Sequence, residues 1–299
     1  MAVLVDELKC GVTKEFKIDD VHAKSYLPKD KKWKLVFSDE FDGDSLDESK
    51  WNYRLNYWGA RSPAFTTEGV EVSNGTLKIN LVRKGDDFSS AHLQTGGLTF
   101  DNPKEDKTKF WPFGKKDEFK FMHRYGYYEI RCKQPKNPDW HSAFWLQSPS
   151  IGAHPDPSVA GVECDIMENY RQYTTGRILC GCGWGGYGAE GKWAGHFEFP
   201  YKETEDGWHY YGVDWSPNGY IFYANGEEVG RQLAPECAVS NVEQFILVST
   251  ECHGYNRVFG KKGEAGESIN CGSPVKELFD AVLPDVFEVD FVRVYDEVK

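Results

Sequence analysis

Three carboxylates stand close together near the middle of the chain, where Glu163, Asp165 and Glu168 have the spacing E-x-D-x-x-E. The surrounding residues are apolar and strand-like, and a charged group is costly to place in a strand that faces a core. Two carboxylates on either side of a glycosidic bond are the groups that glycoside hydrolysis uses. The triplet therefore indicates sugar chemistry.

The alternation of side chains along a strand decides which of these acids share a face. Glu163 and Asp165 have the same parity, whereas Glu168 has the opposite one. A β-bulge would absorb one residue and turn Glu168 to the face of the other two. We therefore predict a bulge at Ile166-Met167 and three carboxylates along one concave face.

The two glutamates suit the two roles of a retaining glycosidase, in which carboxylates about 5–5.5 Å apart act through a covalent intermediate. We assign Glu163 as nucleophile, Glu168 as general acid/base, and Asp165 as the group that orients Glu163 and tunes the pair by like-charge repulsion. The alternatives are a calcium site, although calcium favours loop ligands and carbonyls, and a solvated edge strand, which would not carry Ile166 and Met167.

Composition restricts the partners of the chain. Its 299 residues suffice for one large domain, and 47 acidic against 35 basic residues give a formal net charge of -12. This balance argues against nucleic acid and anionic membranes as partners and fits neutral ligands. The segment Met1 to Asp6 lacks the features of a signal peptide. The eight cysteines form no C-x-x-C pair, so we expect most to be free, buried thiols.

Turn and strand signals indicate an all-β fold. Asn74-Gly75 predicts a hairpin, residues 210–226 predict a meander of three strands, and Val286 to Tyr295 a long closing strand. Only Ser273 to Leu283 has the signals of a helix. Many short strands with glycine turns are typical of a β-sandwich or jelly roll.

We expect two parts along the chain. Residues 1–32 are charged and lack a clear period, so they are predicted to be a loosely attached N-terminal extension. Residues 33–299 show no linker and are predicted to form a single catalytic domain.

The spacing E-x-D-x-x-E resembles the signature of glycoside hydrolase family sixteen, which includes laminarinases, lichenases, agarases, porphyranases and carrageenases. The resemblance implies a concanavalin-like β-jelly-roll sandwich of two antiparallel sheets, and the roles already assigned to the three acids. Five further segments resemble the family in its order, so that the likeness covers roughly residues 33 to 296: Trp33–Gly43, Tyr125–Arg131, Ser142–Leu146, Trp208–Trp215 and Asp290–Tyr295.

The resemblance also implies that Trp145 and Trp184 line the cleft and stack on sugar rings, although tryptophans equally suit a sandwich core. We expect further substrate contacts from Trp58, Trp140, Arg61 and Glu251.

Some segments depart from the β-glucanase pattern. The run from Trp58 to Phe65, with Ser142–Trp145 and Ser249–Glu251, looks more like galactan-cleaving members, and Gly183 stands where a histidine is common. These features favour a galactan or another β-linked polysaccharide over laminarin. A sulfated galactan would need cations in the cleft, for which Arg61, Arg124 and Arg171 are the candidates.

Many members of the family hold a structural calcium on the convex side. Here the matching acid is Asp290, with Glu40 and Gly75 as carbonyl donors. We expect no cofactor to be required for catalysis, a polysaccharide as the substrate, and a monomer. The family is mostly secreted, so we expect a secreted, mature form, and the sequence leaves a cytoplasmic location open.

These features lead to one function and two alternatives. The main hypothesis is a retaining endo-β-glycoside hydrolase that cleaves a β-linked polysaccharide of galactan or β-glucan type by double displacement. A non-catalytic carbohydrate-binding protein on the same fold is one alternative, although such relatives usually lose acids of the triad. A transglycosylase is the other, because it uses the same residues.

Overall fold

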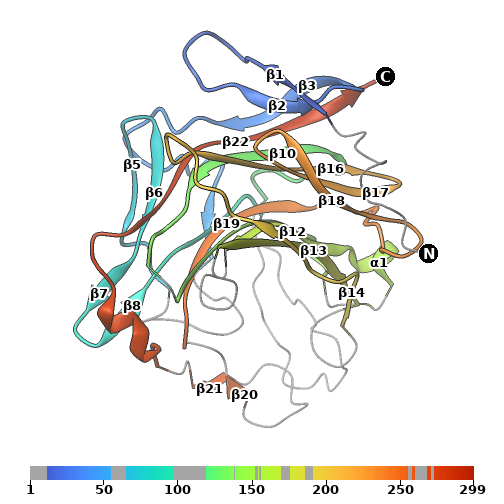
Figure 1. The fold of residues 1–299 in the computed structure, drawn as a ribbon. Helices are drawn as coiled ribbons and strands as arrows, with labels where there is room; N and C mark the ends of the chain where they lie inside the picture. Colours follow the sequence, from blue (N-terminus) through green and yellow to red (C-terminus); the bar gives the residue numbers. More distant parts are fainter. Residues whose placement is uncertain are drawn as a thin grey trace.

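Two antiparallel sheets of eight strands lie face to face in the computed structural model (Figure 1). It describes residues 12–54, 65–96, 119–137, 139–151, 154, 156–169, 176–185, 191–254, 258–259, 268–270 and 273–299. Apolar residues from both sheets, among them Ile130 and Val292 on one and Phe144 and Ile178 on the other, form the main core between them. The predicted all-β sandwich is confirmed.

The first sheet, the β10 sheet, carries the long closing strand at its centre. Its order is β18 (Glu227–Leu233), β17 (Gly219–Ala224), β16 (His209–Ser216), β10 (Gly126–Lys133), β22 (Val286–Val298), β6 (Thr76–Asn80) and β5 (Val70–Ser73), and β3 (Lys32–Asp39) also pairs with β22.

The second sheet, the β12 sheet, carries the acidic strand. Its order is β14 (Lys192–Trp193), β13 (Arg177–Trp184), β12 (Val162–Asn169), β11 (Trp140–Gln147), β19 (Phe245–Cys252), β9 (His92–Gln94) and β4 (Asn52–Tyr53), and β15 (Phe197–Pro200) also pairs with β13.

Three short pairs and two short helices complete the described chain. They are β1 (Thr13–Phe16) with β2 (Ser25–Pro28), β7 (Val82–Lys84) with β8 (Asp87–Ser89), β20 (Val258–Phe259) with β21 (Ser268–Asn270), α1 (Pro157–Ala160) and the 3₁₀ helix η2 (Lys276–Asp280).

The predicted turns and strands are found, whereas the helix prediction needs correction. Asn74 and Gly75 join β5 to β6 with φ angles of 55° and 72°, as a two-residue hairpin turn requires. The meander is β16–β17–β18, and β22 extends beyond Tyr295 to Val298. The segment Ser273 to Leu283 forms only the five-residue 3₁₀ helix, and α1 was not predicted because four residues are too few to show a helical period.

The described part of the N-terminal segment differs from the prediction in one respect, its attachment to the sandwich. It forms the β1–β2 hairpin, which lies on the outer face of the β10 sheet (Figure 1). Leu27 is buried there among Tyr127, Tyr223 and Tyr295. The Arg293 guanidinium donates to the carbonyl oxygen of Ala23 at 2.8 Å. Strand β2 is therefore packed and hydrogen-bonded against this sheet, although the charged sequence predicted a loose end, whereas residues 19–21 are exposed.

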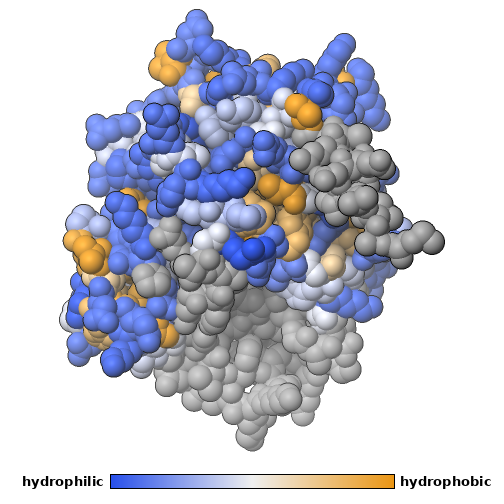
Figure 2. All heavy atoms as spheres, in the orientation of Figure 1, coloured by the Kyte–Doolittle hydropathy of each residue, from blue (hydrophilic) through white to orange (hydrophobic). Residues whose placement is uncertain are grey.

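The surface and the cysteines agree with the sequence analysis where the structure describes them. The visible surface is mainly hydrophilic with separate hydrophobic patches (Figure 2). No described helix is long and apolar enough to span a bilayer. Cys10 and Cys271 lie outside the described residues, and the other six cysteines are free and buried, as predicted: Cys132, Cys164, Cys180, Cys182, Cys237 and Cys252.

Candidate active site

A β-bulge brings the three carboxylates onto one face of β12. Asp165 lies opposite Gly181 on β13 and Glu168 opposite Leu179, so three steps along β12 match two along β13. The register with β11 shifts at the same place. The bulge predicted from strand parity is confirmed, because Ile166-Met167 is the stretch that holds the extra residue and both of its side chains are buried in the main core.

The bulge leaves a backbone carbonyl that the ladder cannot pair in the usual way. The Cys180 thiol, on the neighbouring strand, lies 3.0 Å from the carbonyl oxygen of Ile166 and donates to it. Cys180 therefore stabilises the bulge, since an unsatisfied buried carbonyl destabilises the fold.

The acids point away from the β10 sheet, on a surface that we call the acid face. Glu163, Asp165 and Glu168 are only 8%, 5% and 8% exposed. Buried carboxylates need partners or protons. The neighbours of each acid therefore define what it can do.

Glu163 is held by a chain of two buried polar side chains. The Gln147 amide nitrogen donates to Glu163 Oε2 at 3.0 Å, and Arg54 Nη1 donates to Gln147 Oε1 at 3.2 Å. Because Arg54 binds the amide oxygen, the amide nitrogen must face the carboxylate. The Arg54 guanidinium also lies 5.7 Å from the centre of the Trp145 ring. This chain fixes the orientation of the proposed nucleophile.

Asp165 lies between the two glutamates and is driven toward its protonated form. Burial raises the pKa of Asp165 well above its usual value, and the charges of Glu168 and Glu163 raise it further. His196 Nε2 lies 3.8 Å from Asp165 Oδ2. A protonated Asp165 can donate a hydrogen bond inside the cluster, which suits the orienting role predicted for it.

Two histidines approach Glu168. His141 Nε2 lies 3.4 Å from Glu168 Oε1, and His196 Nε2 lies 3.9 Å from Glu168 Oε2. Among the described residues, Asp165, Glu168 and His196 also have the spacing of a metal site, with ligand atoms within 4.8 Å of one another. The same closeness is what coupled acid catalysis needs, so the cluster requires no metal to explain it.

A second group of ionisable side chains continues across the acid face. Glu251 lies opposite His141 in the β11–β19 pair, and His92 Nε2 is 3.4 Å from Glu251 Oε1. Although burial opposes it, the hydrogen bond from His92 lowers the pKa of Glu251, with help from His141 and His253. Burial lowers the pKa of His253 to about 4, and it also lowers that of His92. At neutral pH Glu251 is therefore ionised, and its partly exposed carboxylate can hydrogen-bond sugar hydroxyls.

The predicted tryptophans fall on different faces. Trp145 lies opposite Asp165, on the acid face, with its Nε1 donating to Ser249 Oγ at 3.0 Å and its surface 4% exposed. Trp184 has the other parity and packs against the main core, and Trp140 is 1% exposed in a separate buried cluster. Neither ring faces the acids, so this geometry gives no support to the stacking predicted for Trp184 or to the substrate contact predicted for Trp140.

Of the other predicted substrate-binding residues and cations, three lie outside the described part of the chain and one is placed away from the acids. Trp58, Arg61 and Arg171 lie outside the described residues. Arg124 donates to the carbonyl oxygen of Asn241 at 3.0 Å, and its guanidinium lies over the ring of Tyr125. Its positive charge is therefore engaged by these two groups and not by the acids.

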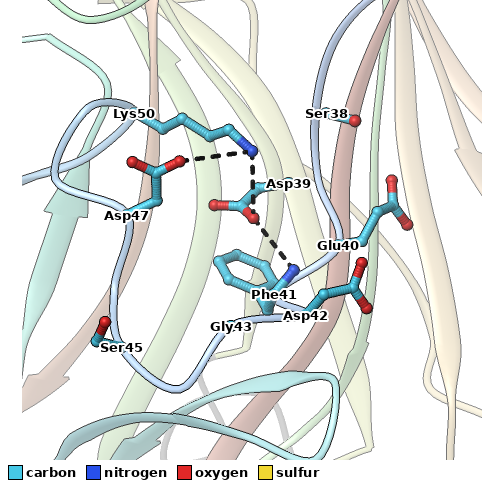
Figure 3. A pocket seen from close by; sticks show the side chains of 9 residues that line it. All are labelled: Ser38, Asp39, Glu40, Phe41, Asp42, Gly43, Ser45, Asp47 and Lys50. Carbon is cyan, nitrogen blue, oxygen red and sulfur yellow. Dashed lines mark hydrogen bonds and ion pairs between the residues drawn. The ribbon is translucent and has the colours of Figure 1, made fainter.

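The predicted calcium site has competing partners. Arg131 Nη1 donates to Asp290 Oδ2 at 2.8 Å, so the expected metal-binding carboxylate already faces a cation. The carboxylate of Glu40 binds Arg293 and borders a small acidic pocket, in which Lys50 lies between Asp39 and Asp47 (Figure 3). The Arg131 guanidinium beside Asp290 fits a calcium ion at that carboxylate poorly. Calcium binding stays a prediction, and a rise in melting temperature on adding calcium would support it.

Sequence reasoning missed the polar residues around the acids. Gln147 and His141 share the parity of Trp145 in the segment from Trp140 to Gln147, so alternation alone could have placed them on the acid face. Arg54 and His196 come from elements distant in sequence, and no local signal identifies them.

Known proteins share this sequence and fold. Residues 64–243 match the sequence model of glycosyl hydrolases family 16. Glucan endo-1,3-beta-glucosidase A1 of Niallia circulans is 25% identical over 88% of this chain, which spans only 38% of that protein. Beta-porphyranase B of Zobellia galactanivorans is 28% identical over 78% of this chain and 79% of its own. The laminarinase of Flavobacterium sp. UMI-01 has the same fold, with a TM-score of 0.61, 20% identity and coverage of 88% of this chain and 100% of its own.

Proposed function

The chain belongs to glycosyl hydrolases family 16, and from this premise we propose that it is an endo-acting, retaining β-glycoside hydrolase. The observation that carries the proposal is the bulge, which places three buried carboxylates on one face of one strand. A strand without it would turn Glu168 into the core.

The proposed reaction has two displacements. The Glu163 carboxylate attacks the anomeric carbon, the bond from that carbon to the leaving oxygen breaks, and Glu168 gives its proton to this oxygen. Glu168 then takes a proton from water, which attacks the same carbon and releases Glu163. Gln147 keeps Glu163 oriented through both steps. The two inversions together retain the configuration.

The charges on the acid face favour an uncharged stretch of substrate. Four carboxylates lie on its described part, those of the triad and of Glu251, while the Arg54 guanidinium is buried against Gln147. A sulfate group would be repelled there. We propose that the sugars on this part of the face are neutral units of a β-linked galactan or glucan. This fits relatives named as a porphyranase and a glucan endo-1,3-beta-glucosidase.

A panel of polysaccharides tests the proposal. Laminarin, mixed-linkage glucan, agarose, porphyran, carrageenan and mucin glycans are incubated with the wild type and with Glu163→Gln. We expect oligosaccharides of several lengths from one of them, a β-anomer as the first product by NMR, and no turnover by Glu163→Gln although it still folds and binds.

Each alternative predicts a different result. An α-anomer as the first product would refute retention. Binding without products from any glycan would indicate a carbohydrate-binding protein. Products longer than the substrate after addition of a sugar acceptor would indicate transglycosylation, and full activity in Glu163→Gln would refute the assignment of the nucleophile.

A further inference from the structure

An exposed tryptophan lies beside the acids on an element that the acidic motif does not include. Trp193, on the two-residue strand β14, is the Cα partner of Gly183, which in turn lies opposite Glu163. Directly paired residues point to the same face of a sheet. The indole of Trp193 therefore lies on the acid face, one strand away from Gly183 and two from the proposed nucleophile.

Two glycines on β13 make room for this arrangement. A Cβ at position 183 would lie 2.8 Å from three atoms of the Trp193 indole, and a Cβ at position 181 would lie 2.6 Å from Cδ2 of His196. Larger residues at these positions would push both rings off the strand. The absence of side chains on the acid face of β13 at Gly181 and Gly183 thus lets β14 and the following residues bring an indole and an imidazole next to the acids.

The two rings form one unit. Their centres are 4.6 Å apart with a tilt of 48°, and the backbone nitrogen of Ala194 between them donates to the carbonyl oxygen of Cys182 at 3.0 Å. His196 Nε2 reaches Asp165 and Glu168 at the distances given above. The position of this unit is therefore fixed against the catalytic strand.

Core packing does not account for the tryptophan. Trp193 is 44% exposed and His196 is 38% exposed. The other exposed large hydrophobic residues on the described surface are aliphatic, and Trp193 is the aromatic one. A large indole left in water beside a cluster of acids is the usual mark of a ligand surface.

We propose that Trp193 and His196 form a sugar-binding subsite next to the cleavage point, an inference that rests on the proposed hydrolase function. The indole stacks on the apolar C–H face of a pyranose ring, and the exposed imidazole edge hydrogen-bonds a hydroxyl of the same unit. The sugar is a neutral one, because an anionic group there would lie close to the negative charge of an acid cluster that includes the nucleophile Glu163. His196 also lies within 4 Å of Asp165 and Glu168, so its removal changes the groups that surround them.

Substitutions test the subsite on the polysaccharide that the wild type cleaves. We expect Trp193→Ala and Trp193→Leu to lower kcat/KM by about fivefold or more, mainly through KM, as loss of a central contact does. We expect His196→Ala to lower kcat/KM and also to shift the pH profile, and His196→Gln to recover part of the binding but not the profile. In a Glu163→Gln background, Trp193→Leu should weaken binding of the same polysaccharide by a similar factor.

Matched controls separate the inference from a folding defect. Trp208→Ala removes a partly exposed tryptophan that stacks on Arg131 at 4.5 Å, on the other sheet, and should leave KM unchanged. Trp193→Leu keeps apolar cover over Gly183 if the alanine variant fails to fold. An active wild type whose KM and binding are insensitive to every Trp193 and His196 variant would overturn the subsite alone, whereas a wild type inactive on all glycans would overturn the proposed function.

Discussion

At the scale of single residues, the candidate active site brings three buried acids together, and burying an ionised group has a cost in stability. Asp165 is the clearest case, because burial and then the charges of Glu168 and Glu163 raise its pKa well above the usual value. A raised folded-state pKa means that its ionisation opposes folding: the contribution to stability is fully present below the ordinary pKa of an aspartate and is lost as pH rises through the folded value.

Asp165→Asn should therefore stabilise the protein while it damages catalysis. We expect its melting temperature to exceed that of the wild type at pH 8, with a smaller difference at pH 4, because the amide cannot ionise. We expect kcat to fall by about tenfold or more, since an amide cannot exchange a proton with the glutamates. Thermal unfolding at the two pH values and steady-state kinetics give the measurement. An equal or lower melting temperature at pH 8 would show that Asp165 ionises without cost.

A second prediction at this scale concerns the hydrogen bonds that link Arg54 through Gln147 to Glu163. Gln147→Met keeps the volume but removes the donor to Glu163 and the acceptor for Arg54. We expect kcat to fall with little change in KM. We also expect the free energy of unfolding to fall by roughly 1–3 kcal/mol, because a buried guanidinium loses a hydrogen-bond partner. Kinetics and urea unfolding would measure both effects. An unchanged kcat would mean that Glu163 is oriented by other contacts.

At the scale of elements, the bulge in β12 depends on its neighbour. Cys180→Ala removes the thiol that donates to the Ile166 carbonyl, and should destabilise the fold by about 1–3 kcal/mol. Because the bulge sets the direction of Glu168, we expect kcat to fall as well. Cys180→Ser, which keeps a donor, should lose less of both. Equal losses in the two variants would assign the effect to packing rather than to the hydrogen bond.

How much of the site the sequence could reveal depends on the range of the signal. The bulge follows from the parity of Glu163, Asp165 and Glu168 within one strand, so it was predictable. Parity also separates Trp184 from the acid face, since it shares the face of Cys180 and Cys182, which are buried in the core. Trp193 was not predicted as a site residue, because its position depends on how β14 pairs with β13. That register is set by pairing between separate strands, and glycines such as Gly181 and Gly183 give no hydrophobic or charge pattern from which it could be predicted.

At the scale of the whole molecule, the N-terminal hairpin closes the outer face of the β10 sheet over buried charges. Its charged sequence predicted a loose end, because the groups that strand β2 contacts are more than a hundred residues away. The backbone nitrogen of Tyr26 donates to Glu129 Oε1 at 2.8 Å, and Ser25 Oγ lies 2.7 Å from the Tyr295 hydroxyl. The two-sheet sandwich was predictable from turns and alternation. The layer above it was not, since its contacts join residues that are distant in sequence.

Glu129 beneath this hairpin makes the stability of the whole fold dependent on pH. Burial raises the pKa of Glu129 to about 8, although hydrogen bonds from Ser25 and Tyr26 and the charge of Arg293 oppose the shift. Its stabilising contribution is fully present below the ordinary glutamate pKa and is lost as pH rises to about 8. Between these limits the native state keeps a proton that the unfolded state has released, so stability falls by up to about 1.4 kcal/mol per pH unit.

Glu129→Gln should remove this dependence, because the amide stays neutral and its oxygen can still accept the hydrogen bond from the Tyr26 nitrogen. We expect the wild type to lose unfolding free energy steadily from pH 5 to pH 8 and Glu129→Gln to lose clearly less, so that the variant becomes the more stable protein near pH 8. Urea unfolding at four pH values measures the slopes. Glu205→Gln, at an exposed turn, should follow the wild type. Parallel slopes for all three proteins would show that Glu129 is ionised in the folded state, held by Arg293 more strongly than burial opposes it.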